Sequence, residues 1–181
     1  MKIGIDISQI VHEGTGVGVY VKHLVGALLK MDEQNEYVLF GASLRKLSRF
    51  TEYFEEVRVV NPRVRLAAFP IPPTLLEFLW NWLHIMPIEW FVGEIDVFWS
   101  SDWIQPPLVH ARGITTIHDV GFLRYPETFA KTIVDVQKRR LAWVKQECKA
   151  ILCDSEATRK DVSELLNIRD SRLQVVYPGY V

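Results

Sequence analysis

Short runs of apolar, mostly β-branched residues alternate along the chain with longer segments whose apolar residues recur every three or four positions. The short runs are typical of strands buried on both faces, and the longer segments are typical of amphipathic helices. The predicted strands cover residues 2–10, 37–40, 57–60 joined with 64–67, 96–100, 114–118, 150–154 and 173–177. The predicted helices cover residues 17–31, 44–54, 74–84, 131–149 and 155–166. This alternation predicts a single Rossmann-like α/β domain, with a mostly parallel sheet of about seven strands, the first one central, and helices on both faces.

The composition is that of one globular domain. The chain has 181 residues, of which 49% are hydrophobic and 24% charged, so one domain is predicted over residues 1–181. The net charge of −1 provides no global basic field, and we therefore expect no nucleic-acid partner. The N-terminus lacks a long apolar signal core and no run of ~18 apolar residues occurs, which predicts a cytoplasmic location. Cys148 and Cys153 lack C-x-x-C spacing and no H-E-x-x-H occurs, so no metal site is predicted.

A glycine-rich segment, made of Gly14, Thr15, Gly16, Val17 and Gly18, joins the first predicted strand to the first helix. Glycines in such a place let backbone N–H groups approach an anion, and the helix dipole adds a favourable potential. The spacing differs from the dinucleotide fingerprint G-x-G-x-x-G because residue 19 is valine, and no acidic residue closes the second strand. The segment predicts an anion-binding loop or, as the alternative, a mobile turn without a ligand.

Two titratable residues, His118 and Asp119, directly follow the β-branched run at residues 114–117. Open α/β sheets bind ligands outside the carboxyl ends of their strands, so this pair predicts a ligand site at that edge. The alternative is a histidine that only caps the strand and whose ring is satisfied by a neighbouring carbonyl. These two residues alone leave both interpretations open.

Six segments with these features occur in one order along the chain. They are GTGVGVYVKHLVGALL, EYVLF, DVFWSSDWIQPP, TTIHDVGFLRYPETF, ILCDSEATRKDV and LQVVYPGYV. Through this set, the whole chain resembles the N-terminal domain of the retaining glycosyltransferases of family 4, which have the GT-B fold. Within that family, it looks most like the mannosyltransferase branch.

The resemblance implies a two-domain enzyme in which two Rossmann-like domains face each other across a cleft. The N-terminal domain mainly receives the acceptor, and the C-terminal domain, which lies outside residues 1–181, holds most of the donor nucleotide. The implied reaction transfers a hexosyl group, mannosyl-like, from a nucleotide-diphosphate sugar to a glycan or lipid-linked acceptor, without a cofactor or an obligatory metal. Because half a cleft cannot position both substrates, residues 1–181 alone are expected to be inactive.

The resemblance also implies roles for single residues. His118 would hydrogen-bond the donor sugar and help to orient the reacting groups, and Asp119 would orient the strand end or contact the ligand. These two are therefore the expected catalytic residues. The loop at residues 14–18 would approach the donor diphosphate and the acceptor. Ser155 and Glu156 match the family's strand-end Ser-Glu pair and would cap a helix or line the cleft.

Aromatic residues are concentrated in residues 75–103, which hold five of the six tryptophans. The five are Trp80, Trp82, Trp90, Trp99 and Trp103. They predict core packing or, as sharper alternatives, a wall for sugar stacking that includes Trp103, or a membrane-interface surface for a lipid-linked acceptor. The helix predicted at residues 131–149 carries six basic residues against Asp135 and Glu147. That pattern predicts a solvated face or, alternatively, peripheral contact with anionic lipid at the inner face of the membrane.

Two other classes of function are alternatives to a glycosyltransferase. One is a non-catalytic module that binds sugar or a partner and acts with a separate donor-binding chain. The other is a dinucleotide-binding oxidoreductase, since its sheet would be similar. The glycine spacing and the missing acid after the second strand argue against the oxidoreductase.

Overall fold

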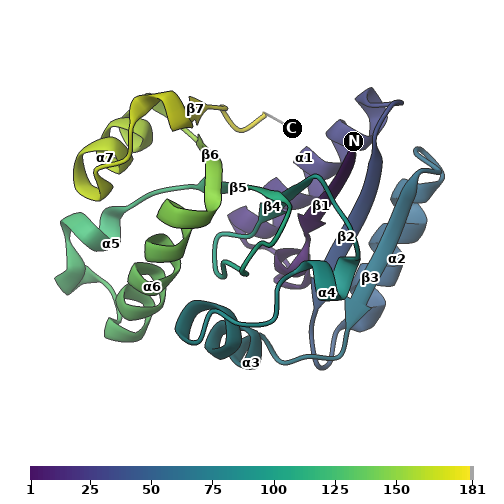
Figure 1. Ribbon diagram of the computed structural model, residues 1–181, viewed down its shortest axis with the longest axis horizontal. Helices are drawn as coiled ribbons and strands as arrows, with labels where there is room; N and C mark the ends of the chain where they lie inside the picture. The colour runs from purple at the N-terminus through teal and green to yellow at the C-terminus, as the bar shows by residue number, and fades with distance from the viewer. Residues whose placement is uncertain (180–181) are drawn as a thin grey trace.

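The computed structural model, described here over residues 1–179, is built on a sheet of seven strands that all run parallel (Figure 1). The strand order is β3-β2-β1-β4-β5-β6-β7. The strands are β1 (Lys2–Asp6), β2 (Glu36–Ala42), β3 (Val64–Phe69), β4 (Val97–Ser100), β5 (Arg112–Ile117), β6 (Cys148–Cys153) and β7 (Leu173–Val175). The predicted fold class is confirmed. The middle strand is β4 and not β1, which lies beside it.

Helices connect the strands and cover the sheet on both sides. The α-helices are α1 (Gly16–Met31), α2 (Leu47–Arg58), α3 (Pro73–Glu77), α4 (Glu89–Val92), α5 (Gly121–Arg124), α6 (Lys131–Glu147) and α7 (Glu156–Leu166). The 3₁₀ turns are η1 (Ser8–Val11), η3 (Pro126–Thr128) and η4 (Asp170–Arg172), and η2 (Phe78–Trp82) is a π-helix. Among residues 1–179, none of these helices combines the length and the apolar character that a bilayer span requires.

Alternation along β2 shows how the two faces of the sheet are used. Tyr37 and Leu39 pack into a cluster with residues of α1 and α2, whereas Val38 and Phe40 pack into another with Trp80 of η2. Successive side chains of a strand point to opposite faces, so β2 is buried between two helical layers. A third cluster joins β5, β6 and β7 to α6 and α7.

Several predicted boundaries were wrong, among them the end of the first strand, residues 57–60 and the end of the helix at 131–149. The first strand ends at Asp6 because its carboxylate accepts a hydrogen bond from Ser8 N (2.8 Å) and turns the chain into η1. Residues 57–60 do not join a strand, since α2 continues to Arg58. The helix predicted at 131–149 ends at Glu147, and β6 begins directly at Cys148.

The order of the strands reverses between β1 and β4, because β2 and β3 lie on one side of β1 and β4 to β7 on the other. Crevices outside the carboxyl ends of the strands at such a switch point are where open α/β sheets bind ligands. All seven strands are parallel, so the segments that follow β1, β4 and β5 meet at this one edge. These segments carry the candidate site.

Candidate functional site

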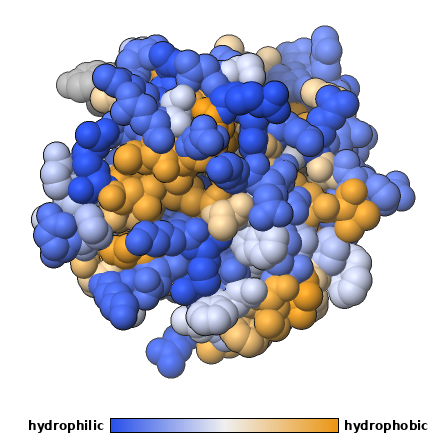
Figure 2. All heavy atoms as spheres, turned by 60° about the vertical axis from the view of Figure 1, so that its left-hand side comes forward, coloured by the Kyte–Doolittle hydropathy of each residue, from blue (hydrophilic) through white to orange (hydrophobic). Residues whose placement is uncertain are grey.

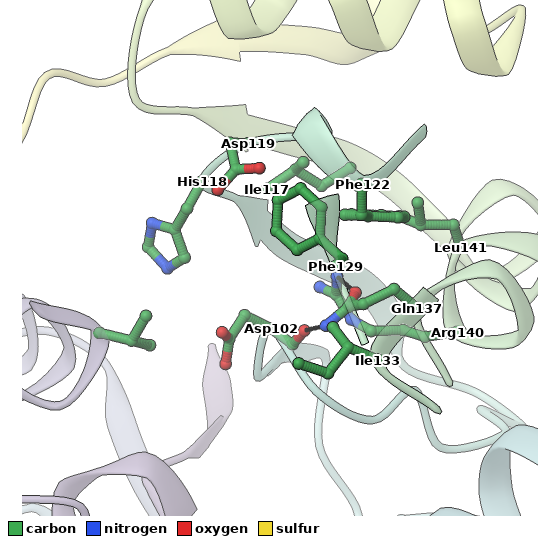
Figure 3. A pocket seen from close by; sticks show the side chains of 11 residues that line it. Asp102, Ile117, His118, Asp119, Phe122, Phe129, Ile133, Gln137, Arg140 and Leu141 are labelled. Carbon is green, nitrogen blue, oxygen red and sulfur yellow. Dashed lines mark hydrogen bonds between the residues drawn. The ribbon is translucent and has the colours of Figure 1, made fainter. Parts of the chain in front are cut away.

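Two cavities that share Asp102 open at the carboxyl edge of the sheet. The smaller, of about 160 Å³, includes His118 at the end of β5 and residues from the start of α1 and from α6 (Figure 3). The larger, of about 410 Å³, lies among the segments that follow β1 and β4. Val17 lines both cavities, and Thr15 and Trp103 line the larger one. The structure therefore brings the glycine loop, the histidine and Trp103 to the same edge of the sheet.

The imidazole of His118 is oriented by Asp154, at the end of the neighbouring strand. Nδ1 of His118 lies 2.6 Å from Oδ2 of Asp154. A carboxylate only accepts, so Nδ1 carries the hydrogen of this bond and Nε2 is left for other partners. The ring of Tyr20 packs edge-on against the imidazole, with centroids 4.9 Å apart. In Figure 3 the imidazole and the carboxylate of Asp102 border the same open space.

The backbone of His118 is fixed through the start of α7. Thr158 Oγ1 donates a hydrogen bond to the carbonyl of His118 (3.1 Å), and Thr158 N donates to Ser155 Oγ (3.1 Å). Ser155 is thus the N-cap of α7 and holds, through Thr158, the end of β5. Glu156 is exposed and pairs with Arg159 (2.7 Å). Neither Ser155 nor Glu156 is among the residues that line the two cavities, and their contact with substrate stays a prediction.

Asp119 points in another direction than its neighbour. Its Oδ1 accepts a hydrogen bond from Gly121 N (2.8 Å), at the start of α5, and its carboxylate lies away from the imidazole of His118 (Figure 3). Asp119 still lines the smaller cavity, so a contact with ligand stays a prediction. The carboxylate that orients His118 is Asp154, which sequence reasoning missed. The signal was available, because Asp154 closes the strand that pairs with β5.

The glycine loop is shorter than predicted, since α1 already begins at Gly16. Thr15 is the N-cap: its Oγ1 accepts from Gly18 N (3.2 Å) and donates to the carbonyl of His12 (2.8 Å). A Cβ atom on Gly18 would lie 2.9 Å from two carbonyl oxygens of the preceding turn, so this glycine is required for packing. Gly14 has φ +75°, a left-handed conformation that favours glycine. Contact of this loop with a diphosphate stays a prediction.

A buried polar cluster that sequence reasoning missed lies beneath the cavities. The guanidinium of Arg140, buried under the sheet edge, donates to Thr115 Oγ1 (2.7 Å) and to the carbonyl of Thr116 (3.1 Å). Burial lowers the pKa of Arg140, and the negative charge of Asp102 opposes that shift. Burial raises the pKa of Asp6, and Asp102 adds to that rise. The two carboxylates and the guanidinium therefore form one electrostatically coupled group at the switch point.

The tryptophans of residues 75–103 do not all serve core packing. Trp80 is fully buried, and the half-buried Trp99 packs against the core and donates to Thr116 Oγ1 (3.1 Å), so core packing is confirmed for these two. Trp82 and Trp90 are exposed, and packing does not account for them. Stacking of a sugar on Trp103 stays a prediction.

Replacing Asp6 with asparagine should stabilise the protein at neutral pH, by about 2–4 °C in Tm. Burial raises the folded-state pKa of Asp6 above the ordinary aspartate value of 3.8. The stability that protonated Asp6 contributes is therefore fully present below pH 3.8, and it is lost as the pH rises through the raised pKa. Asparagine keeps an oxygen for Ser8 N and never ionises. Thermal unfolding of both proteins between pH 3 and 8 checks this.

The advantage of Asp6→Asn should shrink as the pH falls. Asp135→Asn, at a half-exposed position of α6, serves as a control and should change Tm little at any pH. A lower Tm for Asp6→Asn at pH 8 would contradict the prediction.

Comparisons with known proteins add to this geometry. A family model described as Glycosyltransferase Family 4 matches residues 14–180. The chain is 27% identical over 175 residues to O-antigen chain mannosyltransferase B of Escherichia coli, a match that covers 96% of the chain and 46% of that protein. The chain thus spans about half the length of this curated relative.

Among solved structures, a short-chain dehydrogenase from Oenococcus oeni PSU-1 is similar, with a TM-score of 0.46 and 11% identity over 99% of this chain and 96% of that one. A similarity at this level carries no argument about function. The family model, in contrast, covers nearly the whole chain, including the loop before α1, the end of β5 and the start of α7. The chain belongs to Glycosyltransferase Family 4.

Proposed function

We propose that this protein is a retaining glycosyltransferase that moves a mannosyl-like hexosyl group from a nucleotide-diphosphate sugar to a glycan or lipid-linked acceptor. The family favours a glycosyltransferase over a dinucleotide-binding oxidoreductase. The name of the Escherichia coli relative supports mannose as the sugar. The observation that carries the proposal is the position of His118. Asp154 contacts Nδ1 of its ring and leaves Nε2 for another partner, and the ring lines the smaller cavity together with Asp102.

The geometry suggests a division of roles. His118, held by Asp154 in one tautomer, would donate or accept one hydrogen bond with a hydroxyl of the transferred sugar. Asp102 lines both cavities, so its carboxylate oxygens would accept hydrogen bonds from hydroxyl groups of the acceptor. The amino end of α1, with its positive dipole, would face the leaving diphosphate. In this proposal no metal or cofactor is required.

The donor nucleotide would be held by a second domain. The chain corresponds to 46% of the length of its curated relative, which leaves room in such a protein for a second domain of similar size. We propose that residues 1–181 supply the acceptor side of the cleft and are inactive alone. Positioning of both substrates is a large part of such catalysis, and one side of a cleft cannot provide it.

The test is an assay of a protein that carries both domains, using nucleotide-diphosphate sugars labelled in the sugar and a panel of glycan and lipid-linked acceptors. We expect transfer of mannose with retention of the anomeric configuration, which NMR of the product reports. Addition of EDTA should leave the rate unchanged, and residues 1–181 alone should give no product. Binding of sugars without any turnover in the two-domain protein would instead favour the non-catalytic module.

A further inference from the structure

Tyr20, in the second turn of α1, packs against the imidazole of His118. The planes of the two rings are nearly perpendicular (89°), and their centroids lie 4.9 Å apart. Aromatic rings in this arrangement attract each other beyond the effect of the area that they bury. Apolar side chains reach the surface in several separate areas (Figure 2), so exposure alone marks no site. The contact of Tyr20 is more specific, because it acts on the histidine of the candidate site.

The hydrogen bond to Asp154 does not fix the imidazole of His118 completely. It holds Nδ1 at 2.6 Å from Oδ2 of Asp154, but the ring can still turn about the line that joins these two atoms. A second contact that lies across the ring restricts this turn. Tyr20 provides such a contact, since its ring stands perpendicular to the imidazole. The orientation of His118 therefore depends on both neighbours.

The ring of Tyr20 is itself held by the sheet. It also packs edge-on against Trp99 of β4, with centroids 6.4 Å apart and an angle of 79° between the planes. Trp99 Nε1 donates a hydrogen bond to Oγ1 of Thr116 (3.1 Å), which lies on β5 two residues before His118. The three rings of Trp99, Tyr20 and His118 thus form one row across the ends of β4 and β5. Tyr20 keeps a fixed position relative to the strand that carries the histidine.

The hydroxyl of Tyr20 is not what holds the row together. It is buried near Thr116 and Asp154, but it makes no hydrogen bond within residues 1–179. Burial raises the pKa of Tyr20, and the negative charge of Asp154 adds to the rise. The phenol therefore stays neutral at physiological pH. The contribution of Tyr20 comes from its ring, and phenylalanine should replace it.

A purely structural role is the alternative for Tyr20. Its side chain is half-buried, packs at the edge of the core cluster of α1 and α2, and lines a cavity of about 390 Å³ beside residues 176–179. Tyr53 of α2 provides a comparison, because it is only 4% exposed and its hydroxyl donates to the carbonyl of Lys22 (2.8 Å). It lines neither of the two cavities that open at the candidate site. Loss of the Tyr53 ring should thus cost stability without an effect on the site.

We propose that Tyr20 is a positioning residue of the site. Its ring holds the imidazole of His118 in the orientation that leaves Nε2 beside the cavity that Asp102 also lines. Tyr20 lines neither of the two cavities at the sheet edge, so it acts through His118. The orientation of the imidazole is a property of this domain, whereas its effect on sugar transfer rests on the proposed function. The two are therefore measured separately.

The first test is NMR of the 181-residue protein with ¹³C-labelled histidine. The imidazole signals of His118 are assigned by their loss in His118→Ala. Tyr20→Leu should move and broaden these signals, because a perpendicular aromatic ring shifts the resonances of nearby protons and restrains the imidazole. Tyr20→Phe and Tyr53→Leu should leave them in place. His84, whose ring stacks on Trp143, is an internal reference that should not change in any variant.

The second test is steady-state kinetics of the two-domain protein. Tyr20→Leu should lower kcat by about tenfold and change KM by less than about twofold, because a misplaced His118 affects the transition state more than substrate binding. Tyr20→Phe should recover kcat to within about twofold of the wild type, since it restores the ring. Tyr53→Leu should lower Tm and leave kcat near the wild-type value.

Three results would overturn the proposal. One is a Tyr20→Leu protein whose His118 signals match those of the wild type. Another is an equal loss of kcat in Tyr20→Phe, which would assign the effect to the hydroxyl. The third is a raised KM with normal kcat, which would place Tyr20 in substrate binding. Should Tyr20→Leu melt early, Tyr20→Met, which also lacks the ring, gives the decision. If the two-domain protein transfers no sugar, the proposed function fails, and the NMR signals of His118 still decide on Tyr20.

Discussion

Replacing His118 with alanine in the complete two-domain protein is expected to lower kcat by about 100-fold or more, which corresponds to roughly 2.7 kcal/mol of transition-state stabilisation. The imidazole lies at the end of a buried strand, beside the cavity, and Asp154 fixes its Nδ1 (2.6 Å). A group oriented in advance loses little freedom when the transition state forms, so its removal affects turnover more than substrate binding. Steady-state kinetics of both proteins measures the effect.

Two further measurements distinguish a role in the site from a structural one. A structural His118 would give a lower Tm with near-normal kcat, because the loss would fall on packing against Tyr20. Asp154→Asn keeps the imidazole but weakens control of its tautomer, so kcat should fall while KM changes little. Asp161→Asn serves as the control, since Asp161 pairs with Arg124 and lines neither cavity. Near-wild-type turnover by a stable His118→Ala protein would remove His118 from the site.

The sheet could be predicted because its signal is local. The runs at residues 37–40 and 114–117 are apolar or β-branched in every position, as strands covered on both faces require, and they form β2 and β5. Boundaries were less predictable, because they depend on single contacts. The first strand ends where Asp6 bonds Ser8 N, and the glycine segment becomes helix at Gly16 once Thr15 caps it.

Only those site residues could be predicted whose position next to a predicted strand or helix marks them in the sequence. His118 follows a strand, and the glycines stand before a helix, so each carries a positional signal. Asp102 and Arg140 carry none, since they are far apart in sequence and come together only when α6 packs under β5. The π-helix was equally hidden, because a pattern of apolar residues does not reveal that one turn closes over five residues.

Arg140→Met is expected to lower the free energy of unfolding by about 3 kcal/mol, or roughly 6–12 °C in Tm. Methionine fills most of the volume, but it leaves Thr115 Oγ1 and the carbonyl of Thr116 without their donor. It also removes the positive charge that faces Asp102. Asp102, which raises the pKa of the buried Asp6, then lacks that opposing charge, and this adds to the loss.

A second substitution separates this cost from simple loss of packing. Adding Asp102→Asn to Arg140→Met removes the stranded charge, so the double variant should regain part of the lost stability. Lys138→Met, on the exposed side of the same helix, should stay within about 0.5 kcal/mol of the wild type. Equal losses in the single and double variants would assign the effect to the hydrogen bonds of Thr115 and Thr116 alone. A stable Arg140→Met protein would show that the guanidinium is not needed to hold the carboxylates at the switch point. Steady-state kinetics of Asp102→Asn in the two-domain protein would then test whether Asp102 acts in the site.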